Sequence, residues 1–231
     1  MYTVGSAVAK AAQDARRQIL ELAARRLEAA EGDLEIVDGA VGVRGVPART
    51  VAIAELAKLQ SGFGASHPPV FGVASEAIVQ RAPAFGAHAA RVAVDPDSGR
   101  VRVLDYAVAQ DVGRAINPAA IHGQIYGGVA QGIGWALLER MIYDEHGSLA
   151  TGSFLDYALP RATDVPPIRV TLVEVPSERG PFGAKGVGEP PVVPVAAAIG
   201  NAIADASGAR VESLPILPET VVAALARTGR E

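Results

Sequence analysis

The chain has 231 residues, of which 49% are hydrophobic and 20% charged, and its formal net charge is -4. These proportions are typical of a globular protein that buries a substantial core. The mild acidity and the lack of basic runs argue against nucleic-acid binding, and no apolar run reaches the roughly 18 residues of a membrane span. The first residues carry charges within a helical pattern, unlike a secretory signal, so we expect a cytoplasmic protein.

The sequence contains no cysteine. Disulfides, thiolate nucleophiles and iron–sulfur ligation are therefore excluded within this chain. If the chain takes part in redox chemistry, its electrons must pass to another polypeptide. The histidines are too scattered for the spacing of a zinc site; they are His67, His88, His122 and His146.

The first clear element is a helix predicted over residues 6–30. Its apolar side chains recur at spacings of three to five residues and form one stripe. Ser6 is suited to be the N-cap, and Gly5 would let another group approach the free N–H groups of the first turn. Such a helix start can bind a phosphate, although an ordinary capped helix explains the same residues.

Strands and helices of mixed order follow this helix. Asp38-Gly39 between apolar runs predicts a hairpin over residues 34–44, and a short helix is expected after it, over 53–59. Further strands are predicted over residues 70–80, 88–95, 100–109, 168–175 and 210–212, and helices over 118–142, 195–206 and 218–226, with 153–159 either a short helix or extended. Because the two kinds of element intermix without strict alternation, we predict an α+β fold with mixed sheets and packed helices.

The predicted helix over residues 118–142 contains five glycines. Each interior glycine costs about 0.5–1 kcal/mol relative to alanine, so close approach of another backbone or of a ligand is the expected reason for them. Gln124, Gly128 and Gln131 share one face of this helix. That face could hydrogen-bond a polar heterocycle or a phosphate, or it could be a solvent-facing stripe of a helix whose glycines pack on a neighbour.

The stretch over residues 183–191 reads Gly-Ala-Lys-Gly-Val-Gly-Glu-Pro-Pro. Gly188 and Pro190 flank Glu189, and the proline restricts the backbone on which this carboxylate is placed. A carboxylate held in one position is suited to act as a general base, and Lys185 could be a neighbouring donor. The alternative is an ordinary acidic residue at a helix N-terminus.

Together these motifs resemble the molybdenum hydroxylases, the family of xanthine dehydrogenase, aldehyde oxidoreductase and carbon monoxide dehydrogenase. The resemblance covers nearly the whole chain and is to the C-terminal half of the molybdopterin-binding subunit. It is carried by residues 3–7, by Asp111-Val112-Gly113 with Asn117-Pro118, by residues 123–124 and 127–132, and by residues 183–191. It implies that residues 1–231 are the C-terminal part of a molybdopterin-cofactor-binding domain whose N-terminal half is absent from this chain.

The resemblance also implies roles for the matching residues. Glu189 corresponds to the family's catalytic base, and Gln131 to a glutamine near the metal and the pterin. Three further groups of residues would bind the cofactor. Gly5, Ser6 and Ala7 would bind its pyrophosphate, and Gln124 and Gly128 would line its cavity from the helix. Ala184, Lys185 and Gly186 would bring the Gly-rich loop against it. No protein side chain would ligate the metal directly, and Asp111 is expected to be mainly structural.

The implied activity is oxidative hydroxylation of an electrophilic carbon in an aldehyde, a purine or an N-heterocycle. The implied cofactor is molybdenum–molybdopterin in its cytosine dinucleotide form, with a 2Fe–2S cluster and FAD on partner chains. The implied partners are a chain with the N-terminal half of the molybdenum subunit, an iron–sulfur subunit and a flavin subunit. The alternative is a catalytically inactive truncated remnant or an assembly module, against which the retained glycines and the intact Glu189 loop argue.

Overall fold

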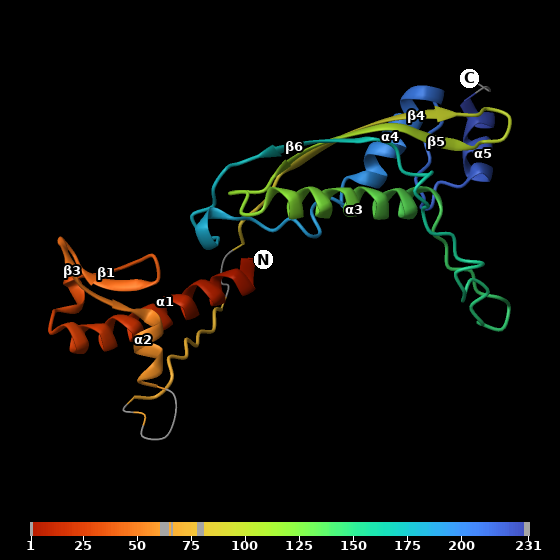
Figure 1. Cartoon of the computed structure of the whole chain (residues 1–231). Helices are drawn as coiled ribbons and strands as arrows, with labels where there is room; N and C mark the ends of the chain where they lie inside the picture. Colours follow the sequence, from red (N-terminus) through yellow and green to blue (C-terminus); the bar gives the residue numbers. More distant parts are fainter. Residues whose placement is uncertain (1, 61–64, 66, 78–80, 229–231) are drawn as a thin grey trace. The chain divides into compact units, whose positions relative to one another are not determined.

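The computed structural model describes residues 2–60, 65, 67–77 and 81–228. The chain divides into two compact units, Met1–Gln80 and Arg81–Glu231. Each unit has its own hydrophobic core, and Figure 1 labels the elements of both. Within the described residues, no helix combines the length and the apolar character needed to cross a membrane.

The first unit is a long helix packed on a three-stranded antiparallel sheet. Its elements are α1 (Tyr2–Leu27), η1 (Glu31–Asp33), β1 (Leu34–Val37), β2 (Ala40–Val43), β3 (Val46–Ala52) and α2 (Ile53–Lys58). The predicted hairpin is confirmed, because Asp38 and Gly39 have φ angles of 48° and 78° and connect β1 to β2 in a two-residue turn. The core lies between the C-terminal half of α1, around Leu20 and Ala23, and the sheet.

Two predictions in this unit are wrong. Helix α1 begins at Tyr2, so Ser6 lies inside the helix and is not its N-cap; its hydroxyl donates a hydrogen bond to the Tyr2 carbonyl at 2.9 Å. The segment over residues 70–77 is not a strand. It runs along α1, where Asp14 and Gln18 bond its backbone. Residues 78–80, the end of that predicted strand, lie outside the described residues.

The second unit is built on a mixed sheet in the order β4-β5-β6. Strands β4 (Gly86–Val94) and β5 (Val101–Asp111) are antiparallel, and β6 (Ile168–Val173) is parallel to β5. The connection from β5 to β6 contains α3 (Pro118–Leu137), and the chain continues through η2 (Pro181–Gly183), α4 (Val195–Ser207) and α5 (Pro218–Thr228). Figure 1 shows α3 and α4 beneath the same face of this sheet.

Helix α3 starts where the sequence indicates and ends earlier. The side chain of Asn117 accepts a hydrogen bond from the Ala120 N–H at 3.1 Å, and Pro118 occupies the first turn. The helix ends at Leu137, before the predicted end at residue 142. Its buried stripe packs on β5 and α4; the stripe consists of Ile121, Ile125, Val129, Ile133 and Ala136.

Three of the five glycines in α3 are explained by close packing. A Cβ at Gly132 would lie 2.4 Å from the Val195 Cβ, and a Cβ at Gly128 would lie 3.0 Å from the Pro191 Cβ. At Gly134 a Cβ would meet the flexible Glu139 carboxylate and would lie 2.9 Å from the Pro160 Cδ. Gly123 and Gly127 instead border open space. The expected close approach is therefore confirmed at three positions, and two positions leave the helix surface uncovered within the described residues.

The remaining elements follow the predictions closely. The strands predicted over residues 88–95, 100–109 and 168–175 and the helices over 195–206 and 218–226 are confirmed within a few residues. Residues 153–159 form turns, and residues 210–212 form no strand. The predicted α+β fold, with mixed sheets and packed helices, is confirmed.

Two alanine substitutions in α3 should have opposite effects on stability. Gly132→Ala forces a methyl group onto Val195, so we expect a loss of about 1–3 kcal/mol in the free energy of unfolding. Gly123→Ala in the same helix meets no neighbour, so we expect a gain of about 0.5–1 kcal/mol. Urea denaturation followed by circular dichroism measures both, and equal effects would contradict the packing described here.

Candidate functional site

The site begins at the C-terminal end of β5, where the strand carries buried polar side chains. Gln110 and Asp111 close the strand, and Asp111 is only 6% exposed. The Asp111 carboxylate accepts a hydrogen bond from the Gly113 N–H at 3.0 Å. Polar groups at such depth need partners, because desolvation without hydrogen bonds is costly. The partner of Asp111 comes from the Gly-rich loop over residues 183–191.

The Gly-rich loop lies directly against the end of β5. The Lys185 N–H donates to the Val112 carbonyl at 3.0 Å, and the Arg114 N–H donates to the Gly183 carbonyl at 2.9 Å. Gly113 has a φ angle of 65°, and a Cβ there would lie 2.3 Å from the Gly183 carbonyl oxygen. Only glycine combines this backbone conformation with such a close approach.

A buried ion pair joins the two segments. The Lys185 Nζ lies 2.5 Å from the Asp111 Oδ2, and Lys185 is only 9% exposed. Burial is the largest single effect on the pKa of the Asp111 carboxyl, and it raises that pKa. The Lys185 ammonium and the backbone N–H groups of Gly113 and Val175 lower the pKa and together outweigh burial. Their combined effect holds the pKa of Asp111 below its usual value.

The other end of the loop is fixed on α3. Pro191 is buried against the backbone of α3 at Gly128, where glycine leaves room for it. Glu189 lies two residues before this contact, and its carbonyl accepts a hydrogen bond from the Val192 N–H at 3.0 Å. The Glu189 side chain itself is exposed. The loop therefore presents this carboxylate between two anchors, at Lys185 and at Pro191.

An exposed face of α3 adjoins the second anchor. Gln124 and Gln131 are exposed and lie within about 60° of Gly128 around the helix axis. Gly127 lies on the same face and borders open space. The structure thus brings the glutamine stripe and the Glu189 loop into one unit, joined at the contact between Gly128 and Pro191. The backbone N–H groups of Ala184 and Lys185 are used within the chain, donating to Pro181 and Val112.

The predicted pyrophosphate residues belong to the other unit. Gly5, Ser6 and Ala7 lie in the first turns of α1, in the unit Met1–Gln80. The Ser6 hydroxyl donates to the Tyr2 carbonyl within the helix. Their role toward a phosphate stays a prediction.

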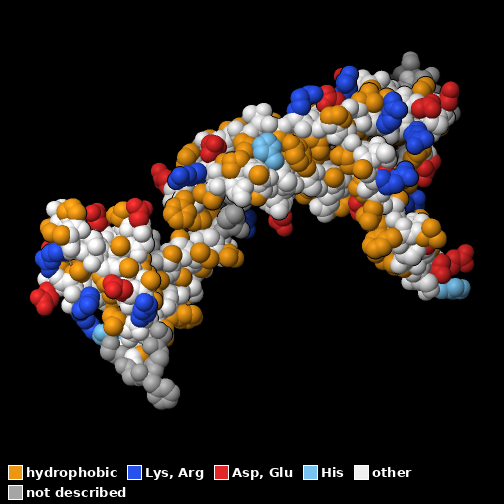
Figure 2. Space-filling view, in the orientation of Figure 1, with side chains coloured by type: hydrophobic (Ala, Val, Ile, Leu, Met, Phe, Trp, Pro, Cys, Tyr) orange, Lys and Arg blue, Asp and Glu red, His pale blue; other side chains and the backbone are white. Residues whose placement is uncertain are grey.

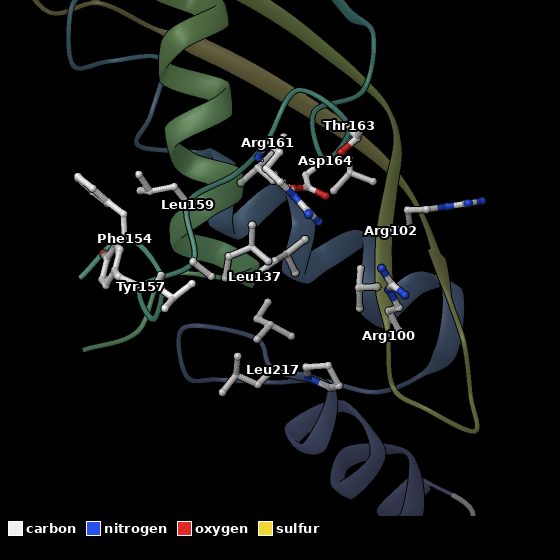
Figure 3. Close-up of a pocket in the computed structure, with 18 residues that line it drawn as sticks. Arg100, Arg102, Leu137, Phe154, Tyr157, Leu159, Arg161, Thr163, Asp164 and Leu217 are labelled. Atoms are coloured by element: carbon white, nitrogen blue, oxygen red, sulfur yellow. Dashed lines mark hydrogen bonds and ion pairs between the residues drawn. The ribbon is translucent and has the colours of Figure 1, made fainter. Parts of the chain in front are cut away.

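A cavity of about 930 Å³ lies elsewhere in the second unit. It is bounded by the start of β5, the end of α3 and residues 154–164, and it includes none of the predicted site residues. Figure 3 shows Arg161 and Asp164 close together at this cavity, where the Arg161 Nε donates to the Asp164 Oδ2 at 3.2 Å. The predicted site is an open wall, whereas this cavity is a separate feature.

Comparison with known proteins decides the family. A family described as the molybdopterin cofactor-binding domain matches residues 1–166. The chain belongs to the molybdenum hydroxylases. It is 38% identical over 228 residues to the nicotine 6-hydroxylase large subunit of Paenarthrobacter nicotinovorans, a match that covers 95% of this chain and 28% of that protein.

Solved structures of molybdenum hydroxylases share the fold. Quinoline 2-oxidoreductase from Pseudomonas putida 86 is 40% identical with a TM-score of 0.74, covering 92% of this chain and 28% of that one. The Cu,Mo-containing carbon monoxide dehydrogenase is 28% identical with a TM-score of 0.80, covering 94% and 28%. The chain thus spans somewhat more than a quarter of the length of these relatives.

The exposed residues of this molybdenum hydroxylase chain fit a molybdopterin group. Two amide side chains, Gln124 and Gln131, and the uncovered helix surface at Gly127 offer hydrogen bonds and space to a large polar heterocycle. The loop that carries Glu189 borders this surface through Pro191. The fit rests on the hydrogen-bonding capacity of the two amides and on the space left at Gly127, where no side chain covers the helix.

Two features of this region were not found from the sequence. Asp111 and Lys185 are 74 positions apart, and no spacing rule pairs them. The contact between Gly128 and Pro191 likewise joins distant segments. The available signal is Gly113, a few residues after the strand predicted over 100–109, because a glycine there indicates a turn or a close approach of backbone.

Removing the ammonium at residue 185 should destabilise the second unit in a pH-dependent way. In Lys185→Met the Asp111 carboxylate stays buried without its partner, so we expect a loss of about 3–5 kcal/mol near neutral pH. Because folding lowers the pKa of Asp111, the stabilisation is present above the unfolded value of about 3.9 and is lost as pH falls through the folded value. In the variant the unpaired carboxylate has a raised pKa, so the gap between wild type and variant should shrink steadily as the pH falls toward and below about 4.

Urea denaturation at several pH values measures this gap. The matched control is Arg169→Met, which breaks the exposed ion pair between Arg169 on β6 and Asp105 on β5. Exposed pairs contribute little, so this variant should unfold nearly as wild type does. A Lys185→Met penalty no larger than that of Arg169→Met would show that the buried pair is not important for stability.

Proposed function

We propose that this chain forms one wall of the active site of a molybdenum hydroxylase and that Glu189 is its general base. The reaction is oxidative hydroxylation of an electrophilic carbon in an aldehyde, a purine or an N-heterocycle. The supporting observation is the position of Glu189, held between the Lys185 and Pro191 anchors beside the exposed glutamine stripe of α3. General bases need such a fixed position, within hydrogen-bond reach of the proton they accept.

The chain's own residues orient and bind, and the cofactor supplies the redox chemistry. Gln124 and Gln131 donate and accept hydrogen bonds along the wall, and Gly128 brings the loop against it. The loop backbone at Ala184, Lys185 and Gly186 would lie against the cofactor. Gly5, Ser6 and Ala7 would bind the pyrophosphate of a molybdopterin cytosine dinucleotide.

The rest of the enzyme comes from further polypeptide. Residues 1–231 act as the C-terminal part of the molybdopterin-binding domain, completed by a chain with the N-terminal half. Since the chain has no cysteine, the ligands of a 2Fe–2S cluster would lie on an iron–sulfur subunit, and a flavin subunit would hold FAD, in a cytoplasmic hetero-oligomer. The relative from Paenarthrobacter nicotinovorans is itself named a large subunit.

Exposed apolar side chains support this dependence on further polypeptide. The segment between α3 and β6, residues 138–167, forms an arm, and Figure 2 shows hydrophobic side chains on its surface. Phe154 and Leu155, on that arm, are 86% and 94% exposed, and Met141 and Tyr143 are exposed nearby. Groups of large apolar side chains on a surface usually mark a protein contact.

The decisive substitution is Glu189→Gln, which keeps the size of the side chain and removes its basicity. In the assembled enzyme that contains this chain, we expect kcat to fall at least about 100-fold, in line with loss of a general base. Molybdenum content should stay unchanged, because the side chain is not proposed to hold the cofactor. Steady-state kinetics and metal analysis of the same preparation measure the two quantities.

Glu178→Gln is the matched control for this experiment. Glu178 is another exposed glutamate, in the segment before the loop, and its substitution should leave kcat unchanged. Full turnover in Glu189→Gln would refute the proposed base. Assembly without molybdenum in the wild-type chain would instead favour an inactive remnant or an assembly module.

A further inference from the structure

The Lys185 side chain is buried and paired inside the protein. Its ammonium lies 2.5 Å from Asp111, and both residues are nearly excluded from solvent. A lysine that binds a cofactor phosphate must reach outward from the loop with free donors, whereas this one points back to the end of β5. The side chain is therefore committed to holding the loop.

We infer that Asp111 and Lys185 form a positioning pair for Glu189. This inference rests on the proposed function, because it assigns Glu189 as the group that is positioned. The pair fixes the register in which the backbone at the end of β5 lies against the backbone of the Gly-rich loop. Gly113 and Ala184 form an isolated antiparallel bridge, and a slip by one residue would turn the Lys185 side chain to the opposite face, away from Asp111.

The loop needs this anchor because its own backbone is permissive. Gly186 and Gly188 lie between Lys185 and Glu189, and glycine restricts the backbone less than any other residue does. Val187 packs on the hydrophobic core, but as a partly buried side chain. With Pro191 fixed on α3, loss of the Lys185 side-chain anchor would leave the other end of the loop held only by its backbone hydrogen bonds to Val112 and Arg114 and by the packing of Val187.

A charged pair is suited to this role because its hydrogen bond is directional. Buried ion pairs often add little to stability compared with apolar side chains of similar size, and their best-attested use is to select one register. An apolar residue at position 185 could pack in several ways. The carboxylate of Asp111, itself held by the Gly113 N–H, accepts the ammonium in one arrangement.

The test compares Lys185→Met, the double variant Asp111→Asn with Lys185→Gln, and Glu189→Gln in the assembled enzyme. For Lys185→Met we expect kcat to fall by on the order of 10- to 100-fold with KM and molybdenum content unchanged, because small misplacement of a reacting group costs this much. The double variant restores an uncharged hydrogen-bonding pair and should recover part of the lost kcat. Arg169→Met, at the exposed pair with Asp105, should match wild type.

Hydrogen exchange gives a readout that does not depend on turnover. In Lys185→Met the backbone amides at positions 185 and 192, which are hydrogen-bonded in the native loop, should exchange faster, while those of α1 should not change. If Lys185→Met does not assemble, Lys185→Arg, which keeps the charge and alters the geometry, gives the same comparison with a smaller expected effect.

The outcomes separate the two proposals. Loss of molybdenum in Lys185→Met would show that the side chain holds the cofactor and would overturn the positioning role. Unchanged kcat and unchanged exchange in Lys185→Met would overturn it as well, even where Glu189→Gln abolishes turnover. Full turnover in Glu189→Gln would overturn the proposed base itself, whatever Lys185→Met does.

Discussion

The buried contact between Asp111 and Lys185 is the interaction on which the arrangement of this site depends. It joins the end of the central strand to the Gly-rich loop, and it requires glycine at position 113 so that the two backbones can touch. Burial alone would disfavour the carboxylate, and its partners reverse that effect. A polar pair therefore holds together two segments that apolar packing alone would leave free to slide.

Helix α3 serves two functions with opposite faces. One face carries branched apolar side chains that pack on β5 and α4, and the other carries amides and uncovered glycine surface. Gly128 lies at the boundary between them and admits Pro191, so the same helix that stabilises the core also places the Glu189 loop. The glycine cost in helix stability is offset by these close approaches at three positions, while Gly127 keeps the open face free of side chains.

The strongest sequence signals predicted most of the secondary structure. Asp38-Gly39 indicated the first hairpin, and Asn117-Pro118 indicated the start of α3, because turn and capping residues act locally. The predictions were wrong where one local sequence pattern is compatible with two different structures. Ser6 resembles an N-cap but bonds back to Tyr2 within α1, and residues 70–77 are extended without a strand partner because they bind to α1.

The sequence by itself determined the family, the fold class, the lack of any cysteine ligand and the candidate base Glu189, since all of these depend on residue identity and local spacing. Only the tertiary structure decided that Lys185 turns inward to Asp111 and that Pro191 rests on Gly128. These contacts join positions 74 and 63 residues apart along the chain. The packing of the sheet and the helices decides which segments meet, and no local sequence pattern encodes that packing.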